Sequence, residues 1–180
     1  MSELPETLAA VSDVDCTGLQ ALVTGSTSGI GRAAALALGR LGADVVVHGR
    51  DPQAGAAVVE ELSRTGADAT FVQADFADLD AVQDLAVAVR EETEGLDLLV
   101  NNAGGLFRNG GLTDAGVEYT FHVNHLSPYL LTTELLGHLR EGARIVTTAS
   151  DAHKGVSLDL DRVRGADRYT GFNAYSHSTG

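Results

Sequence analysis

A glycine-rich turn near the start of the chain has the residue types and spacing of a phosphate-binding loop. Glycines stand at positions 25, 29 and 31, between an apolar run and a helical pattern. The N-terminus of a helix presents free backbone N–H groups and partial positive charge, which suit a pyrophosphate, and glycine allows a tight turn and close approach of a ligand. The pattern favours nucleotide binding over a merely structural turn. The candidate residues are Thr24, Gly25, Ser26, Thr27, Ser28, Gly29, Ile30 and Gly31.

The charge that follows the second apolar run bears on which nucleotide would bind. Residues 49–51 read Gly-Arg-Asp. In a dinucleotide fold, an acid at the end of the second strand binds the ribose 2′-hydroxyl of NAD, whereas an arginine accommodates the 2′-phosphate of NADP. Arg50 therefore favours NADP(H), and Arg32 could add a second positive charge. The adjacent Asp51 keeps NAD possible, and Arg50 could also simply cap a loop.

Apolar runs and helical patterns alternate along the chain, and these elements must position the candidate residues. Short apolar runs predict buried strands at 19–24, 44–48, 69–74, 96–100 and 144–148. Helical spacing predicts helices at 29–41, 52–62, 78–92 and 113–139, the last in two pieces, and another that begins near residue 175. Such alternation builds right-handed βαβ units around a parallel sheet. We therefore expect a Rossmann-type doubly wound α/β sheet in three layers, α/β/α. Residues 1–18 would form an N-terminal tail or short lead-in helix, and residues 19–180 one NAD(P)-binding domain.

Two motifs in their expected elements resemble those of the short-chain dehydrogenases/reductases. The first turn of that family reads Thr-Gly-x-x-x-Gly-x-Gly, as at residues 24–31, and Asn-Asn-Ala-Gly follows its fourth strand, as at residues 101–104. The resemblance covers roughly residues 18–180. It implies further cofactor contacts at Asp75, Asn102, Ala103 and Gly104. The family counterpart of Asp75 hydrogen-bonds adenine, although Asp75 alone could equally be a helix cap.

The resemblance also implies a catalytic set and a reaction. Asn124, Ser150 and Tyr175 match the family residues, with Ala149 in place of the first Ser of the usual pair. In this role Tyr175 would give a proton to a carbonyl oxygen, Ser150 would hydrogen-bond that oxygen, and Asn124 would support a proton relay, while NADP(H) exchanges a hydride. Residues 123–126 and 150–153 look closest to the retinol-dehydrogenase-like branch. That branch suggests a small or lipophilic ketone, aldehyde or alcohol as the substrate.

The sequence departs from the family pattern at position 179 and in its length. Thr179 stands where the family has a lysine that binds the nicotinamide ribose and lowers the pKa of the catalytic tyrosine. Family members usually continue for another 60 or more residues, so the sheet would lack its last strands and the fifth strand would be an exposed edge. A homo-oligomer is expected for a complete member and is in doubt for this chain. Two alternatives stay open: a truncated, catalytically inactive dinucleotide-binding fragment, and a protein that senses a nucleotide or binds a partner.

Composition excludes several other classes of protein. With 25 Asp and Glu against 12 Lys and Arg, the net charge of −13 argues against nucleic acids and anionic membrane surfaces as partners. The start has no basic and apolar signal pattern, and no run approaches ~20 apolar residues, so a cytoplasmic protein is expected. Cys16 alone cannot form an internal disulfide. The acidic surface with one lysine resembles proteins of salt-loving hosts, although a GC-rich genome is an alternative. His122 and His125 lack a third ligand, so no metal site is expected.

Overall fold

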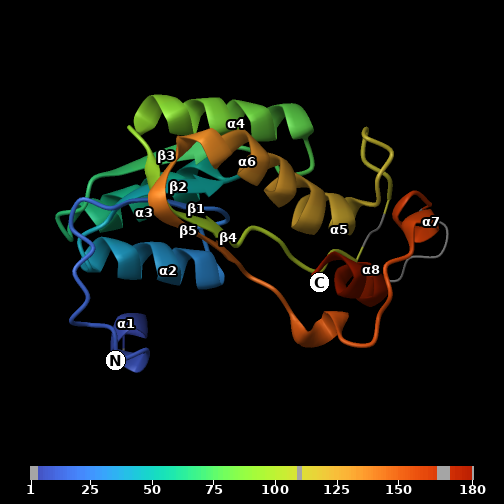
Figure 1. Ribbon diagram of the computed structural model, residues 1–180, viewed down its shortest axis with the longest axis horizontal. Helices are drawn as coiled ribbons and strands as arrows, with labels where there is room; N and C mark the ends of the chain where they lie inside the picture. The colour runs from blue at the N-terminus through green and yellow to red at the C-terminus, as the bar shows by residue number, and fades with distance from the viewer. Residues whose placement is uncertain (1–3, 109–110, 166–170, 180) are drawn as a thin grey trace.

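Five parallel strands form a sheet between two layers of helices in the computed structural model (Figure 1). The structure describes residues 4–108, 111–165 and 171–179. The strands are β1 (Gln20–Val23), β2 (Asp44–Gly49), β3 (Ala69–Gln73), β4 (Leu96–Asn101) and β5 (Leu139–Thr147). The main helices are α2 (Gly29–Arg40), α3 (Pro52–Ser63), α4 (Leu79–Glu92), α6 (Ser127–Leu135) and α8 (Gly171–Ser178). The predicted Rossmann-type sheet is thereby confirmed.

The order of the strands places the loops that carry the predicted site residues at one edge of the sheet. The order is β3-β2-β1-β4-β5, and every pair is parallel. The chain moves outward from β1 to β3 and then crosses back to β4, so the winding reverses between β1 and β4. Doubly wound sheets bind ligands beyond the carboxyl ends of their strands at this switch point. The turn after β1 and the segment after β4 meet there.

Two apolar clusters cover the two faces of the sheet. Leu22, Val46 and Leu99 pack with α4 and α6, whereas Val23 and Val47 pack with α2 and α3. Successive residues of a strand point to opposite faces, so a strand buried on both faces must be apolar throughout. This explains the continuous apolar runs in β1 and β2, and it anchors both strands rigidly beneath the site.

The segment before β1 contacts the domain at two buried residues, Glu6 and Cys16. It contains the short helix α1 (Pro5–Leu8), which agrees with the expectation of a short lead-in helix in residues 1–18. The Glu6 carboxylate pairs with the Arg40 guanidinium, with 2.9 Å between Glu6 Oε2 and Arg40 Nη2, and these hydrogen bonds lower the pKa of Glu6 to about 2. The backbone N–H of Cys16 donates to the Leu41 carbonyl at 2.8 Å. This segment therefore packs against the C-terminal end of α2.

The helix expected at 113–139 is shorter at both ends. Residues 113–118 form a turn instead, with Gly116 at φ +70° and the Thr113 N–H bonded to the Val117 carbonyl at 2.9 Å. The helix begins with α5 (Tyr119–Phe121), passes through a π-helical turn (His122–Leu126) into α6, and closes with a 3₁₀ turn (Leu136–His138). β5 then begins at Leu139 rather than at 144, because residues 139–143 continue beside β4 across an irregularity in register.

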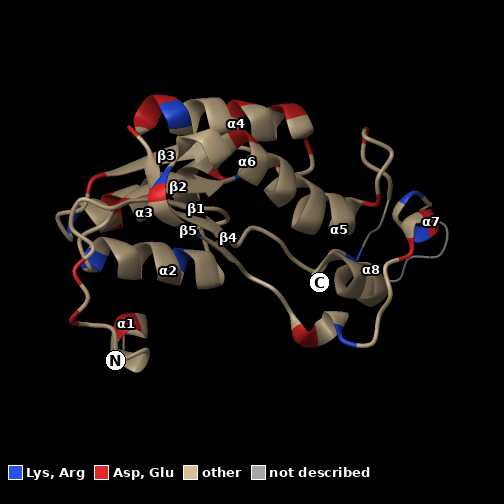
Figure 2. Ribbon diagram, in the orientation of Figure 1, with Lys and Arg blue, Asp and Glu red and all other residues tan. Residues whose placement is uncertain are grey.

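β5 forms one edge of the described sheet and pairs with β4 alone. Ile145 is 42% exposed and Val146 48% exposed, as expected for a strand whose outer side is uncovered. Acidic side chains predominate on α4, which carries Asp80, Asp84, Glu91 and Glu92 but a single arginine, Arg90 (Figure 2). Among the described residues, no helix is long and apolar enough to cross a membrane.

Candidate cofactor and active site

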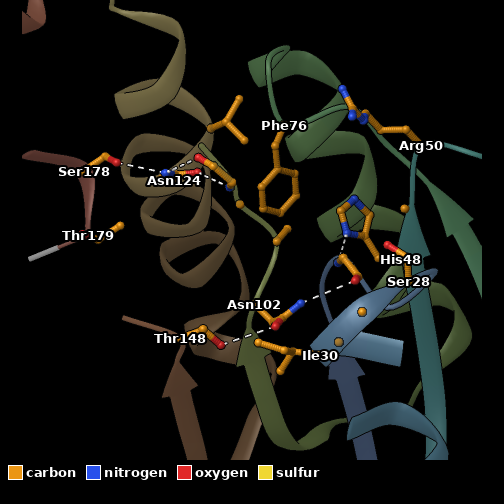
Figure 3. A pocket seen from close by; sticks show the side chains of 18 of the residues that line it. Ser28, Ile30, His48, Arg50, Phe76, Asn102, Asn124, Thr148, Ser178 and Thr179 are labelled. Carbon is orange, nitrogen blue, oxygen red and sulfur yellow. Dashed lines mark hydrogen bonds between the residues drawn. The ribbon is translucent and has the colours of Figure 1, made fainter. Parts of the chain in front are cut away.

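A cavity of about 690 Å³ opens at the carboxyl ends of the strands, where the predicted site residues gather (Figure 3). Segments after β1, β2, β3, β4 and β5 line it, together with the π-helical turn and α8. The predicted residues that line it are Gly25, Thr27, Ser28, Gly29, Ile30, Gly31, Arg50, Asp75, Asn102, Ala103, Gly104, Asn124 and Tyr175. Four predicted residues lie outside the lining: Thr24, Ser26, Arg32 and Ser150.

Two glycines of the turn are required by close packing against the Asn-Asn-Ala-Gly segment. Gly25 has φ +64°, and a Cβ placed on it would lie 2.8 Å from the Ala103 Cα. A Cβ on Gly31 would lie 2.3 Å from Asn102 Nδ2 and 2.4 Å from the Gly25 carbonyl oxygen. Gly29, by contrast, faces open space. The turn is therefore tight on its protein side and open on its cavity side.

The N-terminus of α2 is available for an anion. Ser28 is the N-cap residue, and its side chain makes no capping hydrogen bond to the helix. The first backbone N–H groups of a helix have no intrahelical partner and carry the positive end of the helix dipole. Because Ser28, Gly29 and Ile30 line the cavity, these groups can hold a phosphate there.

Thr24 and Asn102 tie the glycine turn to the end of β4. Thr24 is fully buried, and its hydroxyl oxygen accepts hydrogen bonds from the backbone N–H groups of Asn102 and Ala103 at 2.9 and 3.0 Å. The Asn102 amide donates in return to the Thr24 carbonyl at 2.9 Å. Thr24 thus supports the site from beneath the cavity, which explains why it does not line it.

His48 is a residue of the cavity that sequence reasoning missed. It is 2% exposed at the end of β2, where its Nδ1 accepts the Gly25 N–H at 3.1 Å. Its backbone N–H donates to the Ser26 hydroxyl at 3.0 Å, which gives Ser26 a supporting role outside the cavity lining. Burial lowers the pKa of His48 to about 4. The available signal was a polar residue at the end of an apolar strand, next to Gly49 and Arg50.

The two carboxylates near Arg50 have different roles. Asp51 caps α3, and its Oδ1 accepts the N–H groups of Gln53 and Ala54 at 2.9 and 3.1 Å. Asp75 lines the cavity, accepts the Ala77 N–H at 3.0 Å, and lies 3.9 Å from the Arg50 guanidinium. The Arg50 side chain is 60% exposed and faces the cavity rather than capping a loop.

Arg32 does not add the second charge that the sequence suggested. Its guanidinium pairs with the Glu61 carboxylate of α3, outside the cavity. Arg32 lies three residues beyond the helix start at Gly29, on a side of α2 that packs toward α3. Of the two arginines, Arg50 is therefore the one that brings positive charge to the cavity lining.

The catalytic residues predicted by resemblance are only partly brought together. Asn124 lies in the π-helical turn, where its side chain accepts the Gly105 N–H at 2.9 Å and donates to the Ser178 hydroxyl at 2.9 Å. Tyr175 lines the cavity from α8. Thr179 also lines it, but its hydroxyl donates to the Tyr175 carbonyl at 3.1 Å and is bound to its own helix.

Ser150 is the predicted catalytic residue that lies outside the cavity lining, unlike Asn124 and Tyr175. It caps the short 3₁₀ helix η3 (Asp151–His153), and its hydroxyl accepts the Ala152 N–H at 3.2 Å. The preceding Thr148 and Ala149 line the cavity in its place.

The two histidines three residues apart have structural partners. His122 is buried with its Nδ1 2.6 Å from the Thr113 hydroxyl, and burial lowers its pKa. The His125 ring lies 4.8 Å from the Phe121 ring. Within residues 4–108, 111–165 and 171–179, no three His, Cys, Asp or Glu side chains gather in a way that could hold a metal ion.

Comparisons with known proteins place this fold and site in a family. The model of the family described as short chain dehydrogenase matches residues 20–158. Polyprenol dehydrogenase of Mus musculus is 38% identical over 89% of this chain, and retinol dehydrogenase 13 of Homo sapiens is 33% identical over 85%. The chain belongs to the short-chain dehydrogenase family, and retinol dehydrogenases are among its relatives, as expected. It spans 50% and 47% of these two relatives, about half of their length.

Solved structures of the family include complexes with both kinds of dinucleotide. A short chain dehydrogenase from Burkholderia cenocepacia J2315 in complex with NADP has a TM-score of 0.75 and 34% identity, covering 91% of this chain and 63% of that one. The NADH-dependent reductase A1-R′ complexed with NAD has a TM-score of 0.72 and 30% identity, covering 93% and 69%. Membership of the family thus implies NAD(P) as a class and leaves the choice between the two cofactors to the residues of this chain.

Proposed function

We propose that this chain binds a dinucleotide across the carboxyl ends of β1, β2 and β4, and prefers NADP(H). The observation that carries the proposal is the turn at residues 24–31, which is packed too closely for any Cβ at Gly25 and Gly31 and opens the start of α2 to the cavity. The turn would hold the pyrophosphate, and Arg50 and Asp75 would contact the adenosine end. Asn124 and Thr179 lie on the opposite side of the cavity from Arg50, so its two ends are distinct (Figure 3).

The preference for NADP(H) is argued from the charges at the end of β2. The carboxylate of Asp51 is engaged by the N-terminus of α3, so it is not directed at a ribose 2′-hydroxyl. Arg50 presents a guanidinium to the cavity, which suits a 2′-phosphate. Asp75 lies 3.9 Å from that guanidinium and partly offsets its charge, which keeps NAD(H) as the alternative.

We also propose that the complete protein interconverts a carbonyl and an alcohol. A bound nicotinamide would supply or accept the hydride. Tyr175 would exchange the proton with the substrate oxygen, and Asn124 would hold the π-helical turn against α8 through Ser178. Phe107, Val123 and Ala149 give this end of the cavity an apolar lining, which fits a lipophilic ketone, aldehyde or alcohol.

A second candidate function is that of a dinucleotide-binding protein without turnover. Two observations favour it: Thr179 bonds its own helix in place of a lysine, and the Ser150 hydroxyl faces its own backbone. A nucleotide sensor that binds a partner is a third candidate, and cofactor-dependent capture of a partner would distinguish it from the second. All three readings require the same dinucleotide site.

The test of the cofactor proposal compares Arg50→Ala with Arg64→Ala. Both variants remove one arginine, but Arg64 is 70% exposed on α3 and pairs with Glu60 away from the cavity. A charge-assisted contact contributes roughly 1.5–3 kcal/mol, and exposure places Arg50 near the lower figure, or about tenfold in affinity. Arg50→Ala should weaken NADPH about tenfold by titration calorimetry and change NADH by less than about twofold. Equal losses for both cofactors would refute the 2′-phosphate assignment.

The test of turnover measures NADPH oxidation with a panel of lipophilic ketones and aldehydes. Oxidation that depends on Tyr175, and is lost in Tyr175→Phe with NADPH affinity unchanged, would support the oxidoreductase. Tight NADPH binding without oxidation of any substrate would favour the dinucleotide-binding protein. Absence of NADPH and NADH binding would refute the site itself.

A further inference from the structure

Three hydrogen bonds of 3.1 Å or less join His48 of β2 to the glycine turn after β1, besides a longer one of 3.5 Å from the Ser26 hydroxyl to the His48 carbonyl. The Ser26 N–H donates to the His48 carbonyl at 2.9 Å, and the His48 N–H donates to the Ser26 hydroxyl at 3.0 Å. The third bond involves a side chain: the Gly25 N–H donates to His48 Nδ1 at 3.1 Å. Figure 3 shows the imidazole between the turn and Phe76. Among the described residues, the hydrogen bonds between the turn and β2 thus all involve His48, while Gly49 packs against the Thr27 side chain.

The hydrogen bond from Gly25 determines the chemical form of the His48 ring. Nδ1 accepts a hydrogen bond there and therefore carries no hydrogen, so in the neutral imidazole the hydrogen is on Nε2. Nε2 faces the backbone of Ala74 without a hydrogen bond of standard geometry. Burial lowers the pKa of the ring to about 4, so the acceptor form prevails at neutral pH. The ring also stacks on Phe76, with 4.7 Å between centroids and 29° between planes.

Gly25 is the residue of the turn whose position matters most for the packing around it. It adopts the left-handed region, and a Cβ placed on it would lie 2.8 Å from the Ala103 Cα, so no side chain fits. Its carbonyl oxygen also lies beside Asn102 Nδ2 at 3.4 Å and would be 2.4 Å from a Cβ on Gly31. A displacement of Gly25 would therefore move both the turn and the segment after β4.

We propose that His48 is a positioning residue of the dinucleotide site: by accepting the Gly25 N–H, it holds the turn in the form that binds the pyrophosphate. This inference rests on the proposed function, because it concerns the affinity of the same site. It differs from the role of Arg50, since the pyrophosphate is common to NADP(H) and NAD(H). Substitution of His48 should therefore weaken NADPH and NADH equally, whereas substitution of Arg50 should weaken NADPH more than NADH.

The first experiment compares His48→Leu with His48→Asn, with Val46→Ala as a control. Leucine fills similar space without an acceptor, whereas the Asn side-chain oxygen can take the place of Nδ1. Loss of the acceptor should weaken NADPH and NADH equally, by about tenfold, and His48→Asn should stay within about threefold of the wild type. Val46 is buried in the same strand away from the cavity, so Val46→Ala should lower the melting temperature with unchanged affinities.

The second experiment needs no nucleotide. In nitrogen-15 NMR spectra, the wild-type His48 ring should show an unprotonated Nδ1, and the Gly25 amide should be protected from exchange in the wild type and in His48→Asn. His48→Leu should lose that protection. If the wild type binds neither NADPH nor NADH, the proposed function fails, and so does the proposed effect of His48 on affinity. The NMR measurement then tests only whether the hydrogen bond from Gly25 to His48 is present. A protonated Nδ1 in the wild type, unchanged affinity in His48→Leu, or an Asn variant as weak as the Leu variant would each overturn the proposal.

Discussion

Replacement of Gly31 by alanine tests whether the turn and the segment after β4 are locked together as the structure indicates. A Cβ on Gly31 would meet the Asn102 amide at 2.3 Å and the Gly25 carbonyl oxygen at 2.4 Å. The Gly25 carbonyl belongs to the backbone and can yield only if the turn itself shifts, whereas Asn102 Nδ2 is the end of a side chain. The Asn102 side chain must therefore turn out and give up its 2.9 Å hydrogen bond to the Thr24 carbonyl.

The magnitude follows from three contributions. Overpacking of a buried site costs about 1–3 kcal/mol, and the lost hydrogen bond adds about 0.5–1.5 kcal/mol. The better helix propensity of alanine offsets up to about 1 kcal/mol of this, because Gly31 lies in the first turn of α2. Gly31→Ala should therefore lower the free energy of unfolding by roughly 2 kcal/mol. It should also abolish NADPH binding at temperatures where the variant is folded, because the turn is displaced.

Two other glycines serve as matched controls for this variant. Gly29 has φ +55° and open space around it, so Gly29→Ala should cost about 1 kcal/mol from backbone strain alone. Gly137 has neither a left-handed φ nor a neighbour within 4 Å, so Gly137→Ala should change stability by less than about 0.5 kcal/mol. Urea denaturation followed by circular dichroism measures all three. A Gly31→Ala protein as stable as Gly137→Ala would refute the close packing described here.

Three further perturbations follow from the same structure. His48 has a pKa of about 4 in the folded protein and 6.5 as a free side chain, so between these pH values it takes up a proton on unfolding. The free energy of unfolding should therefore fall as the pH drops from 6.5 to 4. In urea titrations, His48→Leu should show a shallower fall over the same pH range. Glu6→Gln should lower the melting temperature at pH 7, because the ion pair with Arg40 is lost, and this difference from the wild type should shrink as the pH falls from 4.5 to 2. Thr179→Lys alone should give no robust ketone reduction, because Ser150 remains turned to its own backbone; appreciable NADPH oxidation by this variant would contradict that explanation.

The central strands could be predicted because burial on both faces leaves a clear pattern. Val45, Val46 and Val47 are at most 2% exposed, and strand positions buried on both faces favour apolar residues. The start of β5 left no such pattern, because residues 139–143 lie at the sheet edge and include Arg140 and Glu141. The segment 113–118 was misread as helix because its apolar spacing continues through a turn, which Gly116 and the buried Glu118 cap stabilise.

The site could be predicted where function depends on backbone shape, and less well where it depends on side-chain direction. The three glycines of the turn and residues 102–104 line the cavity, and at Gly25 and Gly31 the close packing leaves no room for a Cβ. Arg32 and Ser150 stand at suitable positions in the sequence, but their side chains have nearer partners in Glu61 and the Ala152 N–H. His48 carried no recognisable pattern, because its role depends on a contact between two strands.

The two ends of the cavity differ in how their side chains are held, and this difference bears separately on cofactor binding and on turnover. At the end lined by the glycine turn, Thr24, Asn102 and His48 support the turn through hydrogen bonds of 2.9–3.1 Å, so the proposed phosphate-binding end is held by protein contacts alone. At the other end, the Thr179 hydroxyl donates to the Tyr175 carbonyl of its own helix, and the Ser150 hydroxyl accepts the Ala152 N–H outside the cavity lining. Binding to a preorganised site costs little conformational entropy, whereas a reaction needs several groups aligned at once. Dinucleotide affinity should therefore survive in this chain under conditions in which turnover does not.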